Sequence, residues 1–132
     1  MKGETDLRVL IQNMTPELNP GEYVFCTIDE GKQIDHWAAI GWFREKEGVT
    51  VVLPRLHADA TGLEYSFVAS WISLRVHSAL EAVGLTAAFA SALAEANISC
   101  NVIAAYYHDH IFVPVADAQK AMQVLNDLPK HL

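Results

Sequence analysis

Two stretches in the second half of the chain carry hydrophobic residues at helical spacing, and short apolar runs lie around them. Residues 84–96 and 117–128 repeat an apolar position every three or four residues, so they predict helices. The runs are rich in β-branched and aromatic residues, which favours strands at 66–77 (one long strand or two), 98–106 and 111–115. From residue 66 onward the predicted order is strand, helix, strand, strand, helix.

The first half shows the same alternation in a weaker form. The predicted elements are a helix at 7–14, strands at 22–28, 37–45 and 49–53, and a helix at 55–61. Thr5 or Asp6 is the expected cap of the first helix, and Pro16 is expected to end it. Gly48 allows the hairpin to turn, and Gly62 suits a left-handed end to the second helix.

A helix that crosses between two strands and is followed by a tight hairpin is typical of ferredoxin-like α+β folds. We therefore expect two half-units, one at 1–64 and a clearer one at 65–132, packed as one body without a linker. Their strands are expected to form antiparallel sheet that is covered by helices on one face.

Composition narrows the class of protein. The chain has 132 residues, of which 52% are hydrophobic and 19% charged, so it is too apolar to be disordered. A net charge of −7 with scattered Lys and Arg argues against nucleic-acid or anionic-membrane partners. The longest uncharged apolar stretch, 82–94, is too short to span a bilayer, and the first residues do not resemble a secretory signal. We expect a soluble cytoplasmic protein.

The predicted helix at 84–96 is apolar on both sides. Opposite its Leu and Phe stripe it carries only small residues: Ala87, Ala88, Ala90, Ser91 and Ala94. A helix of this kind is usually buried on two sides. Its second cover is either another subunit or the other half of the molecule, and we expect a homodimer.

The string His108-Asp109-His110 is the most metal-like motif. Two imidazoles on one side of a strand can chelate a divalent ion, with His77 as a candidate third ligand. The string also falls where a hairpin turn is expected, between Tyr106 and Ile111, and no further ligand motif accompanies it. We therefore expect a structural role, in which Asp109 bonds turn amides and the histidines pair with neighbours.

Other catalytic motifs are missing from the sequence. Ser78 is not surrounded by the glycines of a nucleophile elbow, and no phosphate-binding glycine loop is present. Cys26 and Cys100 sit in apolar runs, as expected for reduced, buried thiols. We expect neither enzymatic activity nor a cofactor.

The loop that leaves the strand at 66–77 and opens the helix at 84–96 is the best candidate binding site. Free backbone N–H groups at a helix N-terminus attract a carboxylate, and amide groups further along the chain can bind an ammonium. The alternative is an ordinary loop, and Glu81 either pairs with a ligand or faces solvent. The candidate ligand-binding residues are Ser78, Glu81, Val83, Gly84, Leu85, Thr86, Asn97, Ile98 and Asn101.

The stretch Val-His-Ser-Ala-Leu-Glu-Ala-Val-Gly-Leu-Thr (76–86) and the string Tyr-His-Asp-His-Ile-Phe-Val-Pro (107–114) resemble an ACT domain. The resemblance is closest to small bacterial tandem-ACT proteins and extends, more distantly, to aspartate kinases. It implies a βαββαβ regulatory fold that binds a small amino acid at the loop at 78–86, with Asn97, Ile98 and Asn101 opposite. The loop is longer than in most ACT domains, and only Gly84 matches their Pro-Gly.

Three functions are compatible with these observations. The leading hypothesis is a stand-alone, non-catalytic module that binds an amino acid and regulates a partner on a separate chain. The second is an interaction protein whose ligand site has decayed. The third is a metal-dependent enzyme centred on His108 and His110.

Overall fold

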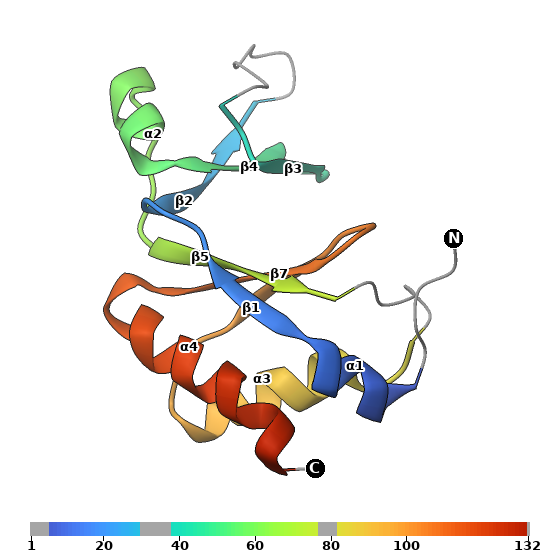
Figure 1. Ribbon diagram of the computed structural model, residues 1–132. Coiled ribbons are helices and arrows are strands. Elements are labelled where there is room, and N and C mark those ends of the chain that lie inside the picture. The colour runs from blue at the N-terminus through green and yellow to red at the C-terminus, as the bar shows by residue number, and fades with distance from the viewer. Residues whose placement is uncertain (1–5, 30–37, 77–81, 132) are drawn as a thin grey trace. The chain divides into compact units, whose positions relative to one another are not determined.

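The computed structural model describes residues 6–29, 38–76 and 82–131. It separates into two compact units, which we call the terminal unit (Met1–Asn19 and Ser70–Leu132) and the central unit (Pro20–Ala69). The helices and strands, labelled in Figure 1, are α1 (Leu7–Asn13), β1 (Thr15–Leu18), β2 (Tyr23–Ile28), β3 (Gly41–Arg44), β4 (Val49–Pro54), α2 (Arg55–Thr61), β5 (Val68–Arg75), α3 (Leu85–Glu95), β6 (Asn101–Ala104), β7 (Asp109–Pro114) and α4 (Ala118–Asp127).

The terminal unit is a sheet covered on one face by helices. Its strands follow the order β1-β5-β7-β6, and α1, α3 and α4 lie on one side of them (Figure 1). The core between the two layers is aliphatic apart from one fully buried aromatic ring, Phe89 of α3. The order along the chain from β5 is strand, helix, strand, strand, helix, as the sequence predicts, and β1 supplies the remaining strand.

β1 is the element that the sequence pattern does not reveal. It pairs antiparallel with β5, from Thr15 opposite Arg75 to Leu18 opposite Ile72. Pro16 does not end the first helix, because α1 already ends at Asn13. It lies within β1, where an edge strand tolerates a residue without a backbone N–H. Four residues of alternating exposure are too few to form a recognisable apolar run.

The β6–β7 hairpin turns earlier than expected. The amide of Ala105 donates to the carbonyl of His108 over 3.1 Å, and β7 begins at Asp109. His110 therefore lies within a strand, and the predicted turn at 107–110 is wrong by about two residues. The strand expected at 98–106 shortens to β6 at both ends. A turn follows α3 at Ala96 and Asn97, where Asn97 takes a left-handed φ of 61°, and the hairpin turn begins at Ala105.

The central unit repeats the pattern. β2 pairs with β4, β4 pairs with β3, and the first two residues of β5 pair with β2, all antiparallel. α2 packs against β2 and β4 over a core that includes Val24, Val51 and Ala58. Two expected caps are confirmed: Asp6 accepts the amides of Arg8 and Val9 at the start of α1, and Gly62 ends α2 at a left-handed φ of 73°.

These observations confirm the predicted fold class, an α+β ferredoxin-like fold with antiparallel sheet. The division into repeats at 64–65 stays a prediction. The compact units are divided differently, because α1 and β1 belong to the terminal unit and not to the central unit. Within the described residues, every helix is too short or too polar to cross a membrane.

The β3–β4 hairpin depends on Gly48. A Cβ there would lie 2.8 Å from the carbonyl oxygen of Ile28, which is backbone and cannot turn aside. We expect Gly48→Ala to lower the free energy of unfolding by about 1–3 kcal/mol, measured by urea denaturation. Gly41→Ala is the matched control, since a Cβ there meets nothing within 4 Å. Equal stability of the two variants would contradict this account.

Candidate functional site

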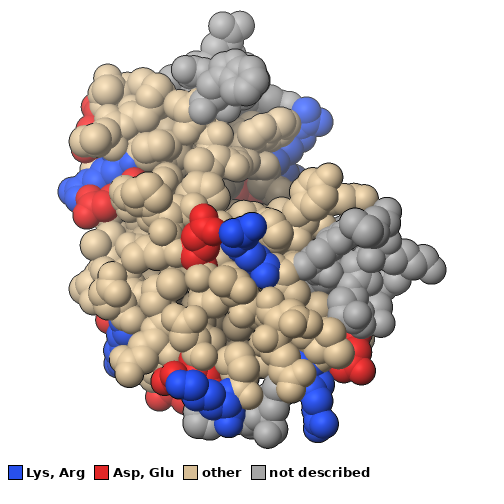
Figure 2. Space-filling model, in the orientation of Figure 1, with Lys and Arg blue, Asp and Glu red and all other residues tan. Residues whose placement is uncertain are grey.

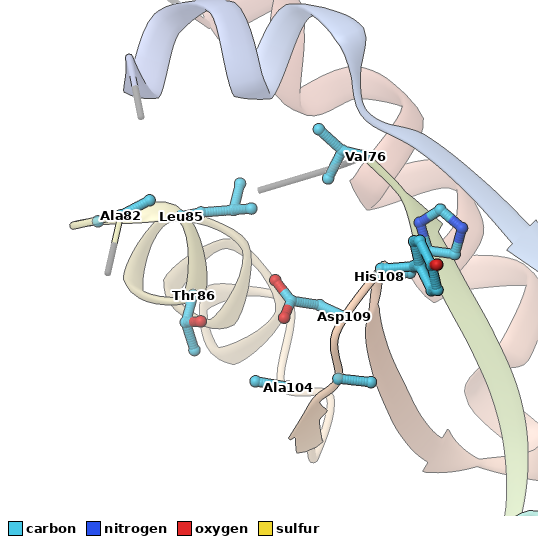
Figure 3. A pocket seen from close by; sticks show the side chains of 10 residues that line it. Val76, Ala82, Leu85, Thr86, Ala104, His108 and Asp109 are labelled. Atoms are coloured by element: carbon cyan, nitrogen blue, oxygen red, sulfur yellow. The ribbon is translucent and has the colours of Figure 1, made fainter. Parts of the chain in front are cut away.

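A cavity of about 130 Å³ lies in the terminal unit where three segments meet (Figure 3). These are the end of β5, the loop that opens α3 and the β6–β7 hairpin. The residues that line it are Val76, Ala82, Gly84, Leu85, Thr86, Ala104, Ala105, Tyr107, His108 and Asp109.

The start of α3 forms one wall, and no side chain among the described residues caps its backbone amides. Gly84 is the N-cap, without a side chain to bond the first turn, and its carbonyl accepts the first helical bond, from Ala88, over 2.9 Å. The amides of residues 85–87 therefore have no partner within the helix, and the first turn contains no acidic residue. Unpaired amides and the helix dipole make this wall attractive to an anion.

Gly84 has a backbone reason to be glycine. Its φ is +100°, and a Cβ would lie 3.1 Å from a methyl carbon of Leu7. Gly84→Val would therefore strain α1 and α3 as well as fill the cavity, and a change in ligand binding in that variant would not isolate the site.

The hairpin forms the opposite wall with two polar side chains. The carboxylate of Asp109 points toward the first turn of α3, where Thr86 lies (Figure 3). Burial raises the pKa of the Asp109 carboxyl, and the neighbouring charge of His108 partly offsets this. The Nδ1 atom of His108 is buried and has no hydrogen-bond partner in the described part of the chain.

The structure brings three of the predicted site residues together, since Gly84, Leu85 and Thr86 all line the cavity. Val83 does not line it, and its side chain is 83% exposed. Ser78 and Glu81 lie outside the described residues, so the structure does not place them.

The other three candidates lie at the far end of α3. Its eleven residues rise about 16 Å, so Asn97, Ile98 and Asn101 do not reach the cavity. Ile98 is a core residue, and the side-chain amide of Asn101 donates to the carbonyl of Phe112 over 3.4 Å. The sequence analysis did not include the hairpin residues in the site, although the string 107–114 carries part of the resemblance to an ACT domain.

His110 has a defined hydrogen-bonding state. Its Nδ1 accepts a hydrogen bond from the indole N–H of Trp71 over 2.9 Å. The same atom lies 3.2 Å from the hydroxyl oxygen of Ser73, and this hydroxyl accepts a hydrogen bond from the side-chain amide of Asn19 over 3.0 Å. Because a tryptophan N–H can only donate, this nitrogen is unprotonated. His110 therefore pairs across strands, as the structural interpretation of the motif expects.

The alternative chemistries find little support. Among the residues that the structure describes, no three His, Cys, Asp or Glu side chains gather as metal ligands, and His77 lies outside them. Cys26 and Cys100 are free, and burial raises both thiol pKa values. A raised pKa leaves less thiolate, so neither thiol is activated as a nucleophile.

Two family models, both described as ACT domain, match residues 2–70 and 66–127. The chain therefore belongs to the ACT domain family, with two ACT domains in tandem. No curated protein matches it.

Solved structures agree with this assignment. A Vibrio cholerae protein of unknown function, described as a possible transport protein, is 54% identical, with a TM-score of 0.82 over 93% of this chain and 95% of that one. Two more distant structures share the fold. Clostridium acetobutylicum aspartate kinase is 9% identical, with a TM-score of 0.65 over 87% of this chain and 34% of that one. The regulatory subunit of aspartate kinase from Thermus thermophilus is also 9% identical, with a TM-score of 0.57 over 86% of this chain and 95% of that one.

The bonds to His110 predict a pH dependence of stability. Burial, together with the charge of His108, lowers the pKa of His110 in the folded protein. The unfolded chain therefore takes up a proton first, and this contribution to stability is present above about pH 6.5 and lost as the pH falls through the folded-state pKa. We expect the free energy of unfolding to drop between pH 7.5 and 5.5 by more in the wild type than in His110→Gln, measured by urea denaturation. If the free energy of unfolding fell equally with pH in wild type and His110→Gln, the pKa of His110 would be the same in the folded and unfolded states, and this account would be wrong.

Proposed function

We propose that this protein is a stand-alone, non-catalytic regulatory module that binds an amino acid in the cavity beside α3. The observation that carries the proposal is the open N-terminus of α3 at the wall of that cavity. Unpaired amides there can bind the carboxylate of an amino acid, and the helix dipole favours its negative charge.

The family assignment supports a regulatory role. The Thermus thermophilus neighbour is described as the regulatory subunit of an aspartate kinase, which is a precedent for an ACT module on a chain of its own. Within the proposal, the repeat at 65–132 binds the ligand and the repeat at 1–64 is the degenerate copy. The regulated partner is a separate protein.

The mechanism we propose is a population shift. A ligand that binds one arrangement of the β5–α3 loop more tightly than another raises the population of that arrangement, and a partner that distinguishes the two responds. We place the protein in the cytoplasm, without nucleic-acid or membrane partners. Its net charge of −7 and the scatter of Lys and Arg on the face seen in Figure 2 argue against a nucleic acid or an anionic membrane as partner.

Ligand binding is tested by thermal shift against the twenty amino acids. Ligand at 100 times its dissociation constant should add about 2.7 kcal/mol of stability. We expect Thr86→Glu, at the cavity wall, to abolish the shift because the new carboxylate takes the place of the ligand's. In the unliganded variant, the gain of about 0.3–1 kcal/mol from an acidic residue in the first turn is opposed by repulsion from the Asp109 carboxylate, so we expect little net change in stability.

Gln119→Glu is the matched control, because it adds the same charge to the first turn of another helix, α4, at an exposed position that does not line the cavity. It should retain the shift. If no amino acid stabilises the wild type, the proposal fails and the interaction-module hypothesis takes its place.

We also propose a homodimer that forms through α3. Ala87, Ser91 and Ala94 are exposed at i, i+4 and i+7, so they form one uncharged stripe of small residues along the helix, while Ala90 packs against the core. Small side chains allow a second backbone to approach closely. The stripe is therefore the part of α3 that we expect to meet a second copy.

Ala94→Glu should convert the dimer to a monomer in sedimentation velocity experiments at micromolar concentration, since it buries a charge in the contact. Gln123→Glu, an equal change of charge at an exposed position of α4, should leave the dimer intact. A monomeric wild type would rule out the dimer without affecting the ligand site.

A further inference from the structure

The hairpin wall of the cavity contains a carboxylate that folding does not explain. Asp109 is half-buried, and its carboxylate accepts no hydrogen bond from the residues that the structure describes. The expected bond from Asp109 to the turn amides is not formed, since the turn is closed between the backbones of Ala105 and His108. Half-burial of the ionised carboxylate costs stability, and the neighbouring charge of His108 offsets only part of this cost, so Asp109 points to a role in binding.

We propose that Asp109 binds the ammonium group of the ligand, and that the ligand is an α-amino acid with a small side chain. This inference rests on the proposed function, because it assigns the second half of the same site. Asp109 takes the role that the sequence analysis gave to amide groups further along the chain. Those groups belong to Asn97, Ile98 and Asn101, which lie at the other end of α3.

The two walls of the cavity have opposite polarity. The start of α3 attracts an anion, and the Asp109 carboxylate, which points toward it, attracts a cation. A simple anion would be repelled by Asp109, and a simple cation would meet the positive end of the helix. A molecule that carries both charges on neighbouring atoms satisfies both walls, and an α-amino acid is such a molecule.

His108 supplies a second sign that the cavity accommodates a polar ligand. Its buried Nδ1 lacks a partner in the described residues, whereas buried polar atoms of native proteins are nearly always hydrogen-bonded. A ligand carboxylate or ammonium in the cavity would provide the missing bond. Either charged group suits the imidazole, since the nitrogen donates in one protonation state and accepts in the other.

The size of the cavity limits the side chain. A protein cavity of about 150 Å³ admits benzene, which has about six non-hydrogen atoms. The cavity here, at about 130 Å³, therefore suits glycine, alanine or serine better than a long or aromatic amino acid.

The test compares L-alanine with propionate, which lacks only the ammonium, on wild type and Asp109→Asn by isothermal titration calorimetry. We expect the wild type to prefer alanine. Asp109→Asn should weaken alanine binding at least tenfold and leave propionate binding equal or tighter, so that the preference disappears. Glu95→Gln, which removes a negative charge at the far end of α3, is the matched control and should bind as the wild type does.

A thermal melt separates binding from structure. Ionised Asp109 is unfavourable in the folded state, so the unliganded Asp109→Asn should melt at the same temperature as the wild type or higher. A clearly lower melting temperature would mean that the carboxylate supports the hairpin, and would overturn the inference.

The remaining outcomes are distinct. If alanine binds wild type and Asp109→Asn equally well, Asp109 is not the ammonium partner, but the amino-acid module stands. If tryptophan or arginine binds the wild type as tightly as alanine, the small-ligand assignment is wrong. If no amino acid binds the wild type at all, the proposed function itself fails.

Discussion

The pairing of β1 with β5 is the contact on which the terminal unit depends. It joins Leu18 to Ile72 across more than fifty residues, and the amide of Asn19 extends the ladder to the carbonyl of Trp71 over 2.9 Å. The pairing also holds α1 in place, so that Leu10 and Ile11 close the core over α3. Closing so long a loop costs entropy that grows only slowly with its length, and burial of these side chains offsets it.

β5 organises the site as well as the core. Ile72 and Leu74 are core residues, and Val76, just beyond the strand, both joins the core and lines the cavity. On β7, Ile111 is anchored in the same core and His110 is bonded to Trp71, so the backbone that carries Asp109 is held on its C-terminal side. These contacts hold the half-buried Asp109 carboxylate in a defined position, as the proposed binding role requires.

Charge is divided unevenly over the protein. The whole chain is acidic, with a net charge of −7, yet the first turn of α3 has no acidic side chain and its amides have no partner within the helix. The attraction for an anion is therefore local and short-ranged, and does not come from the protein's overall field. Specificity at such a site depends on the opposite wall, which in this fold is the β6–β7 hairpin with Asp109 and His108.

Local signals in the sequence were sufficient for most elements. Apolar periodicity predicted α3 and α4, a glycine predicted the left-handed end of α2, and the resemblance over 76–114 predicted the ACT fold and the loop that opens α3. The tertiary structure decided the rest. β1 exists because β5 offers it an edge, which four residues containing Pro16 cannot signal by themselves. Asp109 lies by the first turn of α3 because the hairpin folds back to that end of the helix, whereas Asn97 follows the other end. Such proximity depends on chain topology, which the spacing of residues does not record.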